Sequence, residues 1–239
     1  MHVKLSEYTV PPGIKVPNLM PYQLFPWNGD GYLAAEVLRL KEAHGLNKAI
    51  ETGTCLGSTT LWLRENFRHT WSIEIHRPYF DIAVQRMIAI VGRHIKEDVG
   101  TSNVWIGGHN APGDPNSAML IHGDSAKSIY RRKDALKHNE EKGGIFWFAD
   151  AHWNEHCPLL EELDSIAKSG IHPCILIHDF QVPGTDFGFD KMPDGRPFDM
   201  QLICNHLNDI YGQDKWTYNY PTNVEGARRG WISIEPVQP

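Results

Sequence analysis

The sequence lacks the features that mark a disulfide framework or a membrane protein. Its four cysteines, at positions 55, 157, 174 and 204, are scattered without C-x-x-C spacing through 239 residues, a length that can bury a core without disulfide bonds. No apolar run approaches the roughly 18 residues of a membrane helix, and the start does not combine a basic segment with a continuous apolar stretch. We therefore expect a soluble, cytoplasmic protein without a membrane partner.

A concentrated positive charge is also missing. The net charge is -6, and the densest basic run, Arg131, Arg132 and Lys133, is interpreted as a solvated helix end. This pattern argues against a nucleic-acid partner. Because 41% of the residues are hydrophobic and no internal repeat is visible, we expect a single domain over residues 1–239.

The apolar pattern predicts alternating strands and helices. Residues 31–45 predict a helix that ends at Gly45, and short apolar runs predict strands near 47–51, 70–75, 118–122, 145–149 and 173–178, with helical stretches between them. Such alternation predicts an α/β fold with a doubly wound parallel sheet. Ligands of these folds bind at the carboxyl ends of the strands.

Four segments depart from this alternation. Residues 1–30 contain five prolines and predict an irregular amino-terminal arm. Residues 96–117 predict a surface insertion, because Gly, Pro, Asn and Asp are frequent there. Residues 184–200 predict a long loop, either a lid that closes over substrate or a mobile connection. Residues 215–238 predict two strands around a turn.

The most informative segment is AIETGTCLGSTT, residues 49–60. Glu51 ends a strand, Gly53 and Gly57 allow a tight turn, and a helix beginning at Ser58 directs its free amide groups toward the same point. The spacing is neither the G-x-G-x-x-G of dinucleotide sites nor the G-x-x-x-x-G-K-[ST] of phosphate loops. A carboxylate and the lack of a basic residue favour a nucleotide cofactor that carries a cationic amine and a sulfonium.

A second carboxylate belongs to the same pattern. Glu74 ends the next strand, 23 residues after Glu51, close to the roughly 20-residue interval at which a strand presents a carboxylate to a ribose diol. The two strand ends together predict a pocket for a nucleotide cofactor.

These residues resemble the motifs of a known family. Glu51-x-Gly53-x-x-x-Gly57 resembles the first motif of the class I S-adenosylmethionine (SAM) methyltransferases. Four further segments resemble the catechol-type, cation-dependent O-methyltransferases in the family's order: IEIHRPYFDIAVQRMIAIVG (73–92), IHGDSAKSI (121–129), FWFADAHW (146–153) and ILIHDFQVPG (175–184). The resemblance extends over about residues 36–184.

The resemblance implies a fold and a cofactor site. The fold would be Rossmann-like, with a mostly parallel seven-stranded sheet and an antiparallel last strand. SAM would be bound by residues at four strand ends: Glu51, Gly53, Gly57 and Ser58 at the methionine part, Glu74 at the ribose, and Asp124, Ser125, Asp150, His152 and Trp153 around the adenine side.

A divalent cation is the second expectation. Asp150 ends one strand and His178 and Asp179 end the next, so three metal ligands would lie close together at one edge of the sheet. Carboxylates suit Mg or Mn, whereas the imidazole favours Mn, Zn or Fe. The corresponding ligands in the family are usually all oxygen donors, so His178 departs from the family's pattern. Two other interpretations remain open. Asp179 and His178 could have structural roles, or His152 and His156 could share one helical face as ligands, although cofactor packing is preferred for His152.

The catalytic base is the point where the resemblance fails. The family has a lysine directly after its His-Trp pair, whereas this chain has Asn154, which cannot accept a proton. Glu155, His156 or His178 could take that role, or a metal could acidify the acceptor hydroxyl, with Asp150 and His178 holding it. The acceptor would be a small molecule, and Phe25, Trp27 and Tyr32 either line its pocket or anchor the arm.

Three other functions are weighed against SAM-dependent O-methylation. A metal-dependent hydrolase would use the residues of DAHWNEH and IHDF as ligands, and a non-catalytic relic would bind SAM without turnover. NAD-dependent oxidoreduction is disfavoured by Glu51 and by the missing third glycine. The sequence leaves the oligomeric state open.

Overall fold

The computed structural model describes residues 1–16, 20–91, 95–97, 103–107, 116–141, 143–152 and 156–237. Helices α1 to α7 span Gly31–His44, Ser58–Asn66, Arg77–Val91, Ser125–Arg131, Lys133–Glu140, Leu159–Ser169 and Met200–Tyr211. Strands β1 to β9 span Lys48–Thr52, His69–Glu74, Ile95–Glu97, Asn103–Ile106, Ser117–His122, Ile145–Ala149, Cys174–His178, Trp216–Asn219 and Trp231–Pro236. Two short 3-10 helices, η1 and η2, span Pro21–Leu24 and Pro26–Gly29.

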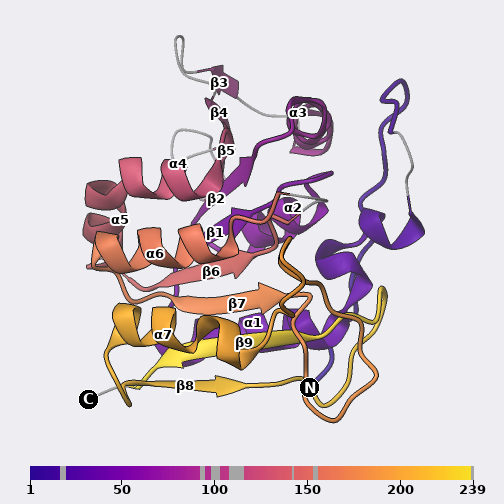
Figure 1. Cartoon of the computed structure of the whole chain (residues 1–239). Helices are drawn as coiled ribbons and strands as arrows, with labels where there is room; N and C mark the ends of the chain where they lie inside the picture. Colours follow the sequence, from indigo (N-terminus) through magenta and orange to yellow (C-terminus); the bar gives the residue numbers. More distant parts are fainter. Residues whose placement is uncertain are drawn as a thin grey trace.

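The strands form one sheet in the order β3-β4-β5-β2-β1-β6-β7-β9-β8 (Figure 1). The five strands from β5 to β7 are parallel to one another, and β9 runs antiparallel to β7. The order β5-β2-β1-β6-β7-β9-β8 is the expected seven-stranded arrangement with an antiparallel last strand. The Rossmann-like fold class predicted from the sequence is therefore confirmed.

The region expected to be a surface insertion, residues 96–117, partly belongs to the sheet. Strand β4 pairs antiparallel with β5, and β3 pairs antiparallel with β4, so the described parts of this region extend the edge of the sheet. The expectation of an irregular insertion is wrong for these residues. Short edge strands with polar neighbours carry little of the apolar pattern that reveals central strands.

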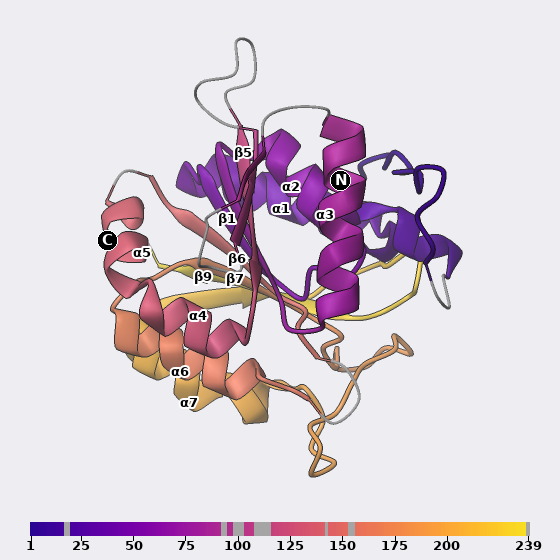
Figure 2. The same ribbon diagram turned by 90° about the horizontal axis from the view of Figure 1, so that it is seen from above.

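Helices cover both faces of the sheet. Figure 2 shows α1, α2 and α3 on one side and α4, α5, α6 and α7 on the other. Apolar side chains of the parallel strands point to both helical layers, which is why these strands are continuous apolar runs in the sequence. None of the described helices is long and apolar enough to span a bilayer.

The order in which the chain adds strands to the sheet reverses at one point. From β1 the chain continues to β2 and β5 on one side, and it later returns to add β6 and β7 on the other side. The strand order therefore reverses between β1 and β6. In open α/β sheets the ligand crevice lies at the carboxyl ends of the strands that flank such a reversal.

The amino-terminal arm, residues 1–30, is irregular except for η1 and η2, as expected. Trp27 is 1% exposed and packs edge-to-face on Trp62 and Phe148, with ring centroids 5.0 Å and 4.9 Å away. Of the two roles considered for the arm's aromatic residues, Trp27 thus has the anchoring one. Phe25 and Tyr32 are half-buried.

Candidate functional site

The glycine loop, residues 53–57, connects β1 to α2 at the reversal of strand order. Gly53 has φ +86°, and a Cβ at this position would lie 2.3 Å from the carbonyl oxygen of Asp150. Gly57 has φ +77° and stands directly against Ala83 of α3. Both positions favour glycine because their backbone is left-handed. At Gly53 a side chain would also collide with the end of β6.

Glu51 points into the protein beneath the glycine loop. It is 1% exposed, and one carboxylate oxygen accepts hydrogen bonds from the hydroxyls of Ser72, at 2.6 Å, and Thr60. Burial raises the pKa of Glu51 to about 8, against the lowering effect of these two hydroxyls, and the negative charges of Asp150 and Glu74 add to the rise. Glu51 therefore supports the loop from below as a buried, hydrogen-bonded side chain.

Glu74 joins the end of β2 to the glycine loop. Its Oε2 accepts a hydrogen bond from the backbone N–H of Cys55 at 2.9 Å, and its Oε1 accepts one from the N–H of His76 at 2.8 Å. The residue is 7% exposed, and burial raises its pKa. Each carboxylate oxygen keeps a second lone pair, so both can still accept a hydrogen bond from a ligand.

Three further residues predicted to contact the cofactor have protein partners. The hydroxyl of Ser58 donates to the carbonyl oxygen of Gln23 in the arm, at 2.8 Å. Asp124 caps α4 by accepting a hydrogen bond from the N–H of Lys127 at 2.9 Å. Ser125 donates its hydroxyl hydrogen bond to Glu162 of α6.

The sequence reasoning missed Glu162. This carboxyl is 1% exposed and also accepts a hydrogen bond from the hydroxyl of Thr52 at 3.2 Å. Burial raises its pKa to about 8, although the hydrogen bonds from Ser125 and Thr52 oppose the rise. Glu162 thus connects the end of β1 to the start of α4. A glutamate within an apolar helix face was the only signal in the sequence.

The ends of β6 and β7 form a second group of side chains, here called the strand-end cluster: Asp150, His152 and Asp179. One ligand atom from each lies within 4.8 Å of the others. The Nε2 of His152 lies 2.7 Å from Asp179 Oδ2. His178, the predicted third ligand, is 3% exposed, and its Nδ1 lies 3.1 Å from Asp150 Oδ1 and 3.3 Å from Asp179 Oδ2.

Asp190 and Arg229 adjoin this cluster, and neither was predicted. Asp190 comes from the segment 184–200 and lies 3.1 Å from His152 Nε2. Arg229, which precedes β9, donates hydrogen bonds to both Asp179 and Asp190. These contacts hold the segment 184–200, proposed from the sequence as a lid or a mobile loop, against the strand ends.

The charges of this region are closely coupled. Burial alone would lower the pKa of His152, but hydrogen bonds to Asp179 and Asp190 raise it to about 10. Burial would likewise lower the pKa of His178, which Asp179 and Asp150 hold well above its usual range. The pKa of Asp179 lies well below its usual value, because His178 and His152 outweigh the effect of burial.

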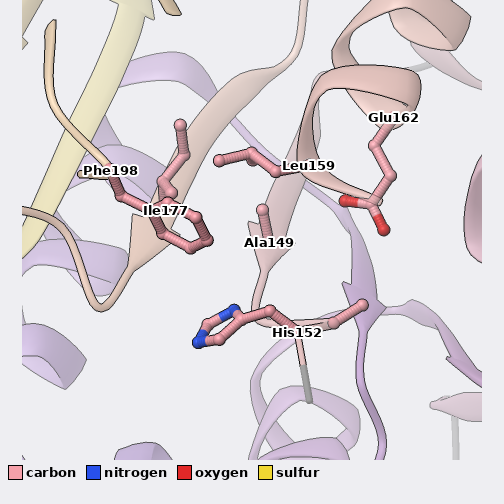
Figure 3. A pocket seen from close by; sticks show the side chains of 7 residues that line it. Ala149, His152, Leu159, Glu162, Ile177 and Phe198 are labelled. Atoms are coloured by element: carbon pink, nitrogen blue, oxygen red, sulfur yellow. The ribbon is translucent and has the colours of Figure 1, made fainter. Parts of the chain in front are cut away.

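A small pocket lies between this region and α6. Figure 3 shows the Glu162 carboxylate and the His152 imidazole at its wall, with Phe198 and Ile177 on the apolar side. Its volume of about 10 Å³ is close to that needed for one water molecule. The imidazole of His152 also packs edge-to-face on Phe198, with ring centroids 5.1 Å apart.

The remaining predicted residues lie apart or outside the described residues. Trp153, Asn154 and Glu155 belong to the undescribed part. His156 is exposed, and α6 begins only at Leu159, so the interpretation of His152 and His156 as ligands on one helical face is wrong.

Comparison of the sequence with protein-family models and with curated proteins gives no match. The fold, in contrast, is similar to solved methyltransferases. The structure of Trm1 from Pyrococcus horikoshii, a complex with S-adenosyl-L-methionine, has a TM-score of 0.56 over 99% of this chain and 61% of that chain, at 9% identity. The O-methyltransferase TomG from Streptomyces achromogenes, involved in tomaymycin synthesis and solved with SAM, has a TM-score of 0.51 over 87% of this chain and 81% of that chain, at 12% identity.

The strand order and these similarities define the class of fold. It is the Rossmann-like fold of the class I SAM-dependent methyltransferases, as the order of the sequence motifs predicted. Identities of 9% and 12% bear on the fold alone, so the activity rests on the residues of the site.

Proposed function

We propose that this protein transfers a methyl group from SAM to a hydroxyl of a small molecule, assisted by a divalent cation. The main supporting observation is that two groups of side chains lie next to each other where the strand order reverses. The glycine loop with Glu74 lies on one side, and the strand-end cluster lies on the other, joined where Gly53 touches the backbone of Asp150. A cofactor and an acceptor bound in these two places would be neighbours.

The electrostatics around the glycine loop suit the charge of SAM. Burial contributes most to the raised pKa of the Cys55 thiol, about 12, and Glu74, Asp150 and Glu51 raise it further. Glu74 and Asp150 therefore make the potential at the loop negative. A sulfonium and an ammonium group would be attracted there, whereas the pyrophosphate of a dinucleotide would be repelled.

Particular residues would hold the parts of the cofactor. The two free lone pairs of the Glu74 carboxylate would accept hydrogen bonds from the ribose hydroxyls. Glu51 would support the loop beneath the methionine part, and the left-handed turn at Gly53 keeps the backbone close to the ligand. Ser125 and His152 border the side on which the adenine would lie.

The donors of the strand-end cluster fit a divalent cation. Two carboxylates and one imidazole are ligand types that Mn²⁺ and Zn²⁺ accept, and Mg²⁺ would use the carboxylates. His152 would have to lose its proton to become a ligand, and Arg229 would have to release Asp179. A bound cation would lower the pKa of an acceptor hydroxyl and hold it in place for the transfer.

The test measures cofactor and metal separately. Titration calorimetry with SAM and with Mn²⁺ should show binding of each, and a labelled methyl group from SAM should appear on a small molecule of a cell extract. Binding of SAM without transfer would instead indicate a relic, and binding of Mn²⁺ without SAM would favour a hydrolase. Absence of SAM binding would refute the proposal.

Variants separate the roles. Asp179→Asn should lose Mn²⁺ binding and transfer while SAM binding is kept, since Asp179 would be one of the ligands of the cation. The matched control is Asp164→Asn, which removes a surface carboxylate whose ion-pair partner among the described residues is His206, at 2.8 Å. Full activity of Asp179→Asn, or activity that persists in EDTA, would remove the metal from the proposal.

A further inference from the structure

Arg86 is a buried cation that none of the proposed steps uses. It lies on α3, it is 0% exposed, and its guanidinium hydrogen-bonds to the glycine loop. Burial lowers the pKa of Arg86, yet a guanidinium stays protonated in any protein environment. A charge held in the interior needs a structural reason, because removing it from water is costly.

The hydrogen bonds of Arg86 join three separate segments. Its Nη1 donates to the carbonyl oxygen of Leu56 in the glycine loop and, at 3.2 Å, to the hydroxyl of Ser58 at the start of α2. Its Nη2 donates at 2.5 Å to the carbonyl oxygen of Tyr8 in the amino-terminal arm. Its Nε finds no acceptor among the described residues. The described acceptors of Arg86 are therefore neutral and belong to the loop, the helix and the arm.

Other contacts lie beside this junction and join the same segments. Ser58, besides its bond with Arg86, donates to the carbonyl oxygen of Gln23 in the arm at 2.8 Å. The backbone N–H of Trp27 donates to the hydroxyl of Thr59 at 2.9 Å, and the hydroxyl of Tyr8 donates to Glu65 at 2.5 Å. The arm is thus hydrogen-bonded to α2, and Arg86 joins both of them to the glycine loop.

We propose that Arg86 is a positioning residue that fixes the conformation of the glycine loop by joining it to the amino-terminal arm. The loop would then hold its cofactor-binding shape only while the arm is docked. A ligand that binds this shape must also stabilise the docked arm, since coupling between two sites is reciprocal. The part that concerns SAM rests on the proposed function; the link between arm and loop does not.

The first experiment needs no cofactor. Lys4 and Lys15 are exposed in the arm, so a protease that cuts after lysine reports arm release, and alkylation of the half-buried Cys55 reports loop opening. Mass spectrometry follows each site separately. Arg86→Met should accelerate both reactions, and Arg86→Lys, which keeps the charge but fewer donors, should lie between it and the wild type.

The matched control is Arg77→Met on the same helix. Arg77 is exposed, pairs with Asp81 at 2.9 Å and lies over the ring of Phe80, both on α3. Its loss therefore removes one charge from this helix and none of the described contacts to the arm or the loop. Thermal unfolding of all variants identifies any that fail to fold, in which case Arg86→Lys carries the test. Faster cleavage of the arm with unchanged alkylation of Cys55, or the reverse, would overturn the proposed link.

The second experiment adds SAM. In the wild type SAM should slow cleavage at Lys4 and Lys15, and Arg86→Met should raise the Kd of SAM about tenfold, within the range of ordinary coupling between sites. Arg77→Met should leave the Kd unchanged. If Arg86→Met opens the arm and the loop but leaves the Kd of SAM within twofold of the wild type, the positioning role is refuted. If the wild type itself binds no SAM, the proposed function fails, and the first experiment still decides the link.

Discussion

Replacement of Glu74 by alanine gives the sharpest test of the cofactor pocket. The side chain is 7% exposed and accepts two backbone hydrogen bonds, from Cys55 at 2.9 Å and His76 at 2.8 Å. Hydrogen bonds to a charged group contribute about 1.5–3 kcal/mol each, and water can replace part of that loss at a site near the surface. We expect Glu74→Ala to lower the free energy of unfolding by about 2–4 kcal/mol.

The same variant should weaken SAM binding by about 2–3 kcal/mol, or roughly 30- to 150-fold, because the ribose hydroxyls lose a charged acceptor. Urea unfolding measures the stability and titration calorimetry measures the affinity. Glu74→Gln should fall between the wild type and alanine, because one oxygen remains as an acceptor.

Asp81→Ala serves as the control for Glu74→Ala. Asp81 is an exposed carboxylate on α3 that pairs with Arg77, so its loss should change neither the stability nor the affinity by much. A folded Glu74→Ala protein that binds SAM within threefold of the wild type would refute the assignment of Glu74 to the ribose.

Three further substitutions test the supporting structure. Burial raises the pKa of Glu162 to about 8 from 4.5, so the folded protein holds a proton there that the unfolded chain releases, and stability should fall as pH rises through this window. Glu162 should contribute a slope on the order of 1 kcal/mol per pH unit, and Glu162→Gln should remove that contribution from unfolding curves measured across the window; an unchanged slope would contradict this origin. Trp27→Ala should cost about 3–5 kcal/mol in urea unfolding, because its ring is buried against Trp62 and Phe148, and a loss below about 1 kcal/mol would show that the arm does not depend on this anchor. Gly53→Ala should destabilise the protein more than Gly184→Ala. Both glycines have positive φ, but of the two added Cβ atoms only the one at position 53 would lie within 4 Å of another atom, the carbonyl oxygen of Asp150 at 2.3 Å. Equal losses of stability would show that backbone strain alone explains the need for glycine at position 53.

The sequence predicted the central strands closely. The five parallel strands begin and end within one residue of the predicted ranges, and α1 ends before Gly45 as expected. Strands buried on both faces appear as continuous apolar runs, so their positions are a local property of the chain. Strands β3 and β4 were missed because they are short, lie at the edge and are surrounded by turn-forming residues.

The edge of the sheet at which the candidate residues lie was predictable. Because parallel strands present their carboxyl ends at one edge, Glu74, Asp150 and Asp179 could be brought together from their positions in the sequence alone. The rotation of each side chain could not be predicted. Glu51 turns inward to Ser72 and Thr60, and Ser58 turns to the arm, although both positions follow the expected motif.

Local sequence determined the helices and strands, because they depend on apolar periodicity and on turn residues a few positions apart. The alternation of these elements then indicated at which edge of the sheet a ligand binds. Tertiary structure alone decided the partners of the buried charges. Arg86 meets Tyr8 across 78 positions, Arg229 meets Asp179 across 50, and Ser125 meets Glu162 across 37. No short pattern encodes such pairs, because a buried polar group takes whichever acceptor the packed elements bring within hydrogen-bonding distance.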